Sequence, residues 1–250
     1  TAVFTVTASH PSAFEMRVDH STTQDSATPA DYVAGSGTLA IPPLETSGTI
    51  AVASREDAID EDAESFTVEL ASPTRAVIGD GVGQAEIADN DDAPVITLAD
   101  ASAAENAGPI GFAWSLSNPS AFDLTFDYET RDNTAKAGTD YLADSGQVAI
   151  PAGTTSGTLN VQLIDNGVDE QAEDFRVDVS GAVRSSLARP TAVGTIGDDE
   201  SAPVLSVANV SVDEDAGQAT FTATLNRPAD RATAFDWATQ NASALAGSDY

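Results

Sequence analysis

Short runs of alternating apolar and polar residues extend along the chain, separated by glycine, proline, asparagine and aspartate. Between residues 93 and 202, Ile110, Phe112, Trp114 and Leu116 would share one face of a strand, because side chains alternate along a strand with a period of two. The pattern predicts strands at Val95–Ala99, Ile110–Leu116, Leu124–Glu129, Gln147–Ile150, Thr158–Ile164, Phe175–Val179 and Val193–Ile196.

The same segment shows no stripe of apolar residues at helical spacing. Seven short strands divided by turn residues within about 100 residues predict an all-β fold, a sandwich of two antiparallel sheets. The aromatic residues on these strands are expected to lie in the core rather than to form platforms for carbohydrate.

An internal repeat links distant parts of the chain. Asp-Tyr occurs at 31–32, 140–141 and 249–250, and the offset is 109 residues both times (140 − 31 and 249 − 140). The same offset relates Ile41-Pro42 to Ile150-Pro151, Asp60-Glu61 to Asp169-Glu170, Ala93-Pro94-Val95 to Ala202-Pro203-Val204, and Glu105 to Glu214. A unit of this length is the size of a domain rather than of a solenoid repeat.

The repeat predicts three tandem sandwiches. We expect residues 1–92 to form a first repeat that lacks its first strand, and residues 93–202 to form a complete second repeat. Residues 203–250 are expected to be the beginning of a third. The chain is thus expected to be an excerpt from a longer tandem array.

Charge narrows the classes of partner. The chain carries 40 acidic residues against 10 basic ones, a net charge of −30, and Lys136 is its only lysine. Nucleic acid and anionic membranes are therefore disfavoured, and cations are favoured. The absence of cysteine excludes disulfides and thiolate metal sites. No apolar run approaches the roughly 20 residues of a membrane span.

Many of the acidic residues fall in loops or at strand ends, which gather at the two ends of a sandwich. Two carboxylates about 4 Å apart repel by about 4 kcal/mol at an effective dielectric of 20, so such a cluster needs cations. Oxygen ligands without thiols or nearby histidines favour Ca²⁺ over Mg²⁺ and Zn²⁺. The register is kept at the offset of 109: Asp31, Glu56, Asp57, Glu61, Glu64 and Asp89 recur as Asp140, Asp165, Asn166, Glu170, Glu173 and Asp198.

Three other interpretations of the acids fit the sequence less well. A solvated, salt-adapted surface accounts for isolated acids such as Asp123 and Asp178, but it would not keep this register. An EF-hand loop starting at Asp165 would place Glu170 at the required glycine and Arg176 at the bidentate glutamate. Residues 79–83 lack the tandem glycine-rich nonapeptides of a calcium β-roll. Calcium held by converging loops remains the prediction.

The residues resemble the Calx-beta domain family, known from sodium/calcium exchangers, integrin β4 and large bacterial surface proteins. The resemblance covers essentially all of the chain and rests on Glu105–Gly108, Tyr128–Ala135, Ala137–Tyr141, Ile150–Gly153, Asp165–Phe175 and Thr195–Asp199. It implies a seven-stranded immunoglobulin-like sandwich with calcium among the loop carboxylates at one end. By the repeat, it implies a tandem array of such sandwiches.

The resemblance also implies a set of calcium ligands. In the second repeat these are Glu105, Asp140, Asp165, Glu170, Glu173, Asp198 and Asp199, with a backbone carbonyl from Val168 and an amide oxygen from Asn166, where the family usually has an acid. In the first repeat they are Asp31, Glu56, Asp57, Glu61, Glu64, Asp89 and Asp91, with Ile59 at the carbonyl position. The third repeat keeps only Glu214 and Asp249, so we expect no complete site there.

Three classes of function follow from these expectations. The first is a calcium-rigidified spacer and adhesion segment of a large surface or secreted protein, whose partners are calcium, neighbouring repeats and a cell-surface or matrix ligand. The second is a calcium-sensing module of a membrane protein that serves cell communication. The third, an enzyme, ranks last, because His10 and His20 have no counterparts at Pro119 and Glu129.

Overall fold

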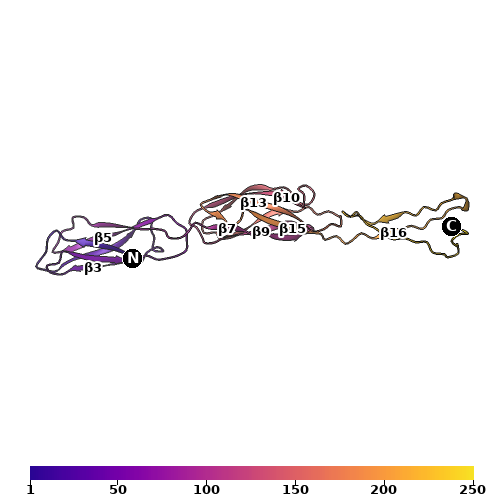
Figure 1. Cartoon of the computed structure of the whole chain (residues 1–250). Helices are drawn as coiled ribbons and strands as arrows, with labels where there is room; N and C mark the ends of the chain where they lie inside the picture. Colours follow the sequence, from indigo (N-terminus) through magenta and orange to yellow (C-terminus); the bar gives the residue numbers. More distant parts are fainter.

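The protein forms an elongated row of β-structure. The computed structural model describes residues 1–250, and the three repeats follow one another along a single axis with the two termini at opposite halves of the rod (Figure 1). Its only helices are two three-residue 3₁₀ turns, η1 (Glu105–Ala107) and η2 (Glu214–Ala216). No helix is both long and apolar enough to span a membrane.

The second repeat is a sandwich of two sheets. One sheet has five strands in the order β11-β10-β13-β15-β8, and the other has four in the order β12-β9-β7-β14. The strands are β7 (Val95–Leu98), β8 (Ala101–Ala104), β9 (Pro109–Leu116), β10 (Leu124–Asp132), β11 (Ser145–Ile150), β12 (Ser156–Gln162), β13 (Glu173–Val183), β14 (Ser186–Leu187) and β15 (Thr191–Gly197). The all-β, immunoglobulin-like sandwich predicted from the sequence is confirmed.

All seven predicted strands of the second repeat are present, and two short strands were not predicted. β8 runs parallel to β15 and β14 runs parallel to β7, whereas the other pairs of this repeat are antiparallel. β7 and β8 are separated by only Ala99 and Asp100, so one extended segment passes from one sheet to the other. The small residues of β8 carry no apolar alternation, which is why the sequence pattern did not reveal it.

The core of the second repeat lies between its two sheets. Eighteen buried residues form one cluster, and Phe175 is a fully buried member of it. The Tyr141 ring stacks on Phe175 at 4.3 Å between centroids, while Phe112 meets it edge-on at 5.8 Å. Gly194 is required beside these rings, since a Cβ there would lie 2.7 Å from both phenylalanines. Trp114 is only 6% exposed, so the prediction that the strand aromatics form the core is confirmed.

The first repeat has the same plan with fewer strands. A four-stranded sheet of order β3-β2-β5-β6 faces a two-stranded sheet of β1 and β4. Its core cluster has six buried residues, including Tyr32 stacked on Phe66 at 4.2 Å. The strands are β1 (Ala2–Thr7), β2 (Met16–Gln24), β3 (Ser36–Ile41), β4 (Ser47–Val52), β5 (Glu64–Thr74) and β6 (Val82–Ile87).

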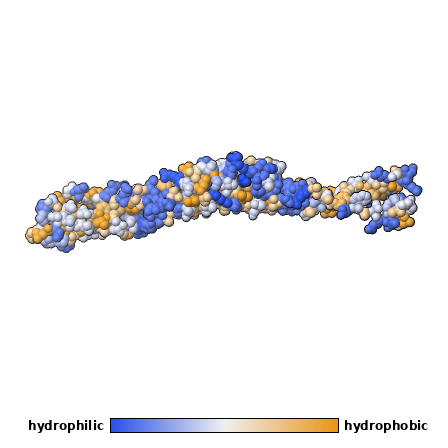
Figure 2. Space-filling view, in the orientation of Figure 1, coloured by the Kyte–Doolittle hydropathy of each residue, from blue (hydrophilic) through white to orange (hydrophobic).

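Residues 203–250 contain one pair of short strands, β16 (Leu205–Val207) and β17 (Ala223–Leu225), followed by an open loop. None of these residues is buried, and Trp237 is 81% exposed. The acidic loops of the first two repeats lie at the ends that face the next repeat. Hydrophilic surface is correspondingly concentrated at both junctions (Figure 2).

Candidate metal centre

Acidic side chains from four segments between strands converge at one end of the second repeat. Glu105 opens η1 directly after β8, and Asp198 follows β15. Because β8 pairs with β15 in the register Ala104↔Gly197, the two acids are brought side by side. Glu173 is the first residue of β13, whose third residue, Phe175, is fixed in the core.

Asp140 is positioned by its neighbours on both sides. Its Oδ2 accepts a hydrogen bond from the Lys136 amide at 2.6 Å, and the next residue, Tyr141, is fully buried against Phe175. The Asp140 side chain is therefore held in a tight loop at the acidic end. The residue is itself buried, with 9% of its surface exposed.

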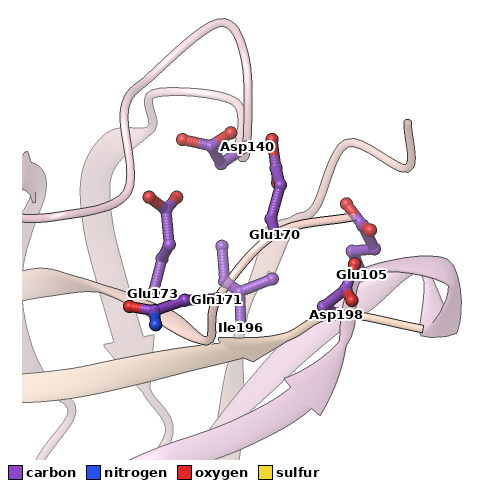
Figure 3. Close-up of a pocket in the computed structure, with 7 residues that line it drawn as sticks. All are labelled: Glu105, Asp140, Glu170, Gln171, Glu173, Ile196 and Asp198. Carbon is purple, nitrogen blue, oxygen red and sulfur yellow. The ribbon is translucent and has the colours of Figure 1, made fainter. Parts of the chain in front are cut away.

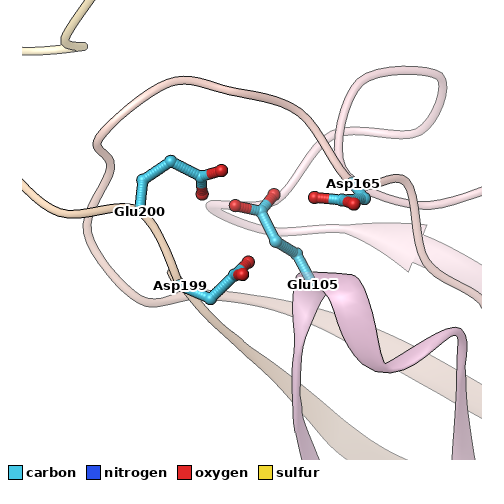
Figure 4. A group of neighbouring side chains, drawn as sticks. All are labelled: Glu105, Asp165, Asp199 and Glu200. Atoms are coloured by element: carbon cyan, nitrogen blue, oxygen red, sulfur yellow. The ribbon is translucent and has the colours of Figure 1, made fainter.

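The first group of candidate ligands consists of Glu105, Asp165, Asp199 and Glu200. One carboxylate oxygen from each lies within 4.8 Å of the others. Figure 4 shows these four carboxylates turned toward one another from three different loops. Glu200 was missing from the predicted ligands, although the acidic run Asp198–Glu200 was a signal that could have included it.

A second group lies beside the first and shares Glu105 with it. Glu105, Asp140, Glu170, Glu173 and Asp198 line a small pocket together with Gln171 and Ile196. In Figure 3 the carboxylates of Glu170 and Glu173 point toward Asp140. Glu105 therefore belongs to two adjoining sets of oxygen atoms.

Burial and mutual repulsion raise the pKa of several of these carboxyl groups. Burial, followed by a hydrogen bond and charge repulsion from Glu200, raises the pKa of Glu105 to about 8. Burial and the charge of Asp140 raise the pKa of Glu173 to about 7. The pKa of Glu170 is raised as well, with burial as the main cause. Bringing these carboxyl groups together in the folded chain thus disfavours their charged form.

Three carboxylate oxygens of the cluster are buried without a hydrogen-bond partner: Glu105 Oε1, Asp198 Oδ1 and Glu200 Oε2. Buried polar atoms in folded proteins are normally satisfied, so these atoms call for a ligand. A set of carboxylates and carbonyls, without sulfur or imidazole, suits a hard cation, and Ca²⁺ accepts six to eight such oxygens. The residues present therefore fit calcium.

Asn166 differs from the expected oxygen ligand. Its Oδ1 accepts the Val168 amide at 2.7 Å, and its Nδ2 donates to Glu105 at 3.2 Å and Glu170 at 3.3 Å. The side chain therefore closes the turn after Asp165 and offers hydrogens to two carboxylates. Val168 is half-buried in the same loop.

The first repeat holds a smaller group at the equivalent end. Asp31, Glu61 and Glu64 each place a carboxylate oxygen within 4.8 Å of the others. Burial and a hydrogen bond to Asp31 raise the pKa of Glu64 to about 7. Burial alone would also raise the pKa of Asp31, but hydrogen bonds from Thr28 lower it. The pKa of Glu61 is raised by burial and by Asp57.

The other predicted ligands of the first repeat lie in adjoining loops, outside this group of three. The Ile59 amide donates to Asp57 at 2.9 Å, and the Glu61 amide donates to Asp89 at 3.3 Å. Glu56 accepts a hydrogen bond from Asn90 at 2.7 Å, and the Asp91 amide donates to Asp89 at 3.2 Å. These bonds tie the two loops together around Asp89.

Asp174, which the sequence analysis did not include among the ligands, is engaged elsewhere. Its carboxylate accepts hydrogen bonds from Thr134 at 2.7 Å and Asn133 at 2.8 Å, and these bonds lower its pKa. Asp174 thus pins the loop after β10 to β13 rather than facing the acidic cluster.

Part of the chain is similar in sequence to known proteins. A stretch of 106 residues is 31% identical to sodium/calcium exchanger 1 of Canis lupus familiaris and of Cavia porcellus, and covers 41% of this chain. The match spans 11% of those relatives' length.

Among solved structures, the apo form of the Calx CBD1 domain is 25% identical, with a TM-score of 0.39, over 42% of this chain and 99% of that one. CBD12 from CALX1.2 is 14% identical, with a TM-score of 0.40, over 78% of this chain and 93% of that one. The sequence profile of the Calx-beta domain matches residues 1–93, 89–200 and 197–250, which together cover the chain from end to end. The chain therefore belongs to the Calx-beta domain family.

Proposed function

We propose that this chain is a calcium-binding array in which metal completes and stiffens the acidic end of each full repeat. The observation that carries the proposal is the shared position of Glu105 in two adjoining groups of carboxylates, with buried oxygens that lack partners. An uncompensated cluster of this kind destabilises the fold, whereas bound cations convert the same oxygens into ligands.

The ligands that we propose for the second repeat are the predicted ones with Glu200 added and Asn166 reassigned. Glu105, Asp165, Asp199 and Glu200 would hold one ion. Asp140, Glu170, Glu173 and Asp198 would hold another, with Glu105 between the two. Asn166 would orient Glu105 and Glu170 through its amide hydrogens. In the first repeat we propose a site around Asp31, Glu61 and Glu64, with Glu56, Asp57, Ile59, Asp89 and Asp91 in the adjoining loops.

The stabilisation from metal would be large for a small domain. A ligand at a hundredfold excess over its Kd adds about 2.7 kcal/mol per site. Domains of this size are typically stable by only about 5–15 kcal/mol. Extracellular modules bind calcium at about 10⁻⁴ to 10⁻³ M, a range in which metal would keep each repeat folded outside the cell.

We therefore propose a spacer or adhesion role in a surface or secreted protein. Support comes from the end-to-end arrangement of the repeats and from the acidic loops at the ends that face the next repeat (Figure 2). The partners would be calcium, the neighbouring repeats and a cell-surface or matrix ligand. An enzymatic role is not proposed.

The likeness to sodium/calcium exchanger 1 favours a second candidate, a calcium-sensing module of a membrane protein. A sensor would change the angle between repeats when calcium binds, and a spacer would mainly lose flexibility. The distribution of distances between labels on the first and second repeats separates the two: a shifted mean indicates a sensor, and a narrower width indicates a spacer.

Isothermal titration calorimetry with CaCl₂ tests the binding itself. The chelator-treated chain should release or absorb heat, and a variant combining Asp165→Ala and Glu173→Ala should keep only the part that comes from the site proposed in the first repeat. The matched control is Glu129→Gln, an exposed acid on β10. If the double variant binds calcium as the unmodified chain does, the proposed sites are wrong.

A further inference from the structure

The two junctions between repeats share one backbone contact in the same register. Asp60 of the first repeat forms a parallel β-bridge with Ser120 of the second. Asp169 of the second repeat forms a parallel bridge with Ala229 of the third. Both partners are shifted by 109 residues, so the contact follows the repeat rather than a local accident of sequence. Asp169 is also one of the acids that the sequence analysis did not assign to metal.

The first junction is closed by hydrogen bonds that Asp60 donates and accepts. The Asp60 amide donates to the Pro119 carbonyl at 3.1 Å, and the Ala121 amide donates to the Asp60 carbonyl at 2.9 Å. The Ser120 hydroxyl donates to Asp60 Oδ2 at 2.7 Å. Ser120 is only 2% exposed, so this bond to a carboxylate is shielded from water.

The same hydroxyl is anchored within its own repeat. Ser120 Oγ accepts the Phe122 amide at 3.2 Å, which leaves its hydrogen free to point at Asp60. The loop between β9 and β10 is thus shaped to receive the aspartate of the preceding repeat. The residue after Asp60, Glu61, turns its carboxylate to the group formed with Asp31 and Glu64.

The second junction keeps the backbone contact and lacks the hydroxyl. The Asp230 amide donates to the Asp169 carbonyl at 3.3 Å, and Ala229 occupies the position of Ser120. The Asp169 carboxylate makes no hydrogen bond there, and the exposed side chains of Gln171 and Arg231 meet instead at 2.8 Å. The two junctions therefore differ in the charge-assisted bond from the Ser120 hydroxyl and in the bond from the Asp60 amide to the Pro119 carbonyl, which has no counterpart at Asp169.

We propose that this aspartate is a docking residue for the following repeat, and that the residue facing it sets how firmly the joint is held. Serine at that position donates a hydrogen bond to the aspartate, which we call the latch, and holds the two repeats firmly together. Alanine cannot donate this bond, so the junction is looser. In the Asp-Glu pair of each repeat, the aspartate then serves the neighbouring repeat while the glutamate serves the acidic cluster. The inference refines the proposed spacer role, and the functional value of a firm junction rests on that role. The docking contact itself requires no metal.

Amide hydrogen exchange of the full chain, measured by NMR in EGTA, tests the latch without calcium. Ser120→Ala should speed exchange of the Asp60 and Ala121 amides roughly tenfold, the size expected for losing a hydrogen bond to a charged group. Asp60→Ala should speed exchange of the Ala121 amide by a similar factor, and it leaves the hydrogen bond from the Phe122 amide to Ser120 Oγ intact. Asp169→Ala, whose side chain makes no such bond, is the matched control and should leave both amides unchanged.

A second measurement reads the joint directly. Since the chain has no cysteine, spin labels can be placed at Glu86→Cys on the first repeat and Thr158→Cys on the second, both exposed strand positions. Ser120→Ala should broaden the distribution of distances between the labels. Ala229→Ser should slow exchange of the Asp230 amide at the other junction.

The outcomes separate the latch from the calcium proposal. Unchanged exchange and an unchanged distance distribution in both Ser120→Ala and Asp60→Ala would overturn the latch, whatever calcium does. Loss of calcium binding with the latch effects intact would overturn the proposed function alone. Fluorescence of Trp114 confirms that each variant is still folded in the second repeat.

Discussion

Replacing Glu105 with glutamine should change stability in opposite directions with and without calcium. In the chelated chain, Glu105 is a buried carboxyl group surrounded by Glu200, Glu170 and Asp198. Glutamine keeps the shape of the side chain and removes its charge. The variant should therefore be more stable than the unmodified chain in EGTA, and it should gain less stability when calcium is added.

The size of the effect follows from the pKa of Glu105, which is raised to about 8 from an ordinary value of 4.5. One pKa unit corresponds to about 1.4 kcal/mol, so at pH 7.5 the folded state is penalised by about 4 kcal/mol if Glu105 acts alone. Glu105 does not act alone, because it lies against the Glu200 carboxylate, and we therefore expect about half of that, roughly 2 kcal/mol. For a domain of this size, the melting temperature would rise by roughly 10 °C.

Tryptophan fluorescence makes this measurement specific to the second repeat. Trp114 lies in its core, the first repeat contains no tryptophan, and Trp237 is already 81% exposed. Thermal melts of Glu105→Gln and of the control Glu129→Gln would be compared in EGTA and in CaCl₂. If Glu105→Gln lowers the melting temperature in EGTA, the carboxylate is not under electrostatic strain and the reasoning fails.

Three further predictions concern pH, the strand crossover and the core. Without calcium, the pKa values of Glu105 (about 8) and Glu173 (about 7) are raised in the folded chain, so the stability that these groups contribute is complete below about pH 4.5 and is lost as pH rises through 7–8. Urea unfolding in EGTA should therefore give a higher free energy of unfolding at pH 6 than at pH 8.5, and equal values would contradict this prediction. Arg189→Ala should lower the free energy of unfolding by about 1 kcal/mol, because the guanidinium donates hydrogen bonds to Asp100 at 2.8 Å and to the Leu98 carbonyl. The hydrogen bond from Arg189 lowers the pKa of Asp100, so in urea unfolding the difference in stability between variant and unmodified chain should shrink as pH falls below about 4. Gly194→Ala should cost at least about 2 kcal/mol, since its methyl group would lie 2.7 Å from two core phenylalanine rings, and a melt unchanged by this substitution would show that the core can yield there.

The fold was largely predictable because its signals are local and repeated. Alternation along Pro109–Leu116 and Leu124–Asp132 fixes which face of each strand is buried, and the offset of 109 residues carries that interpretation from one repeat to the next. β8 escaped prediction because Ala101–Ala104 has small side chains, and its place depends on pairing with β15, more than 90 residues away. Such pairing is a property of the folded sandwich, and no local pattern encodes it.

The acidic cluster was predictable in composition and less so in detail. Spacing brought Glu105 and Asp165 into one candidate site, but two features depend on side-chain direction: Asn166 turns its oxygen to the Val168 amide, and Glu200 turns inward. A run of consecutive acids in the sequence does not show where any one side chain points. The loop backbone sets the orientation, through hydrogen bonds such as that from the Val168 amide to Asn166.

The Asp-Glu pair shows the same limit and explains why the repeat keeps two adjacent acids. Consecutive residues in an extended segment point in opposite directions, so one loop can face a metal cluster and a neighbouring domain at once. Asp60 bonds the following repeat while Glu61 joins the acidic group, so movement of either side chain is transmitted through one peptide unit. Neutralisation of the acidic cluster by a cation and docking of the next repeat would therefore act on adjacent residues. An array built this way would extend the stiffness of one repeat to the next, without any contact beyond the loop itself.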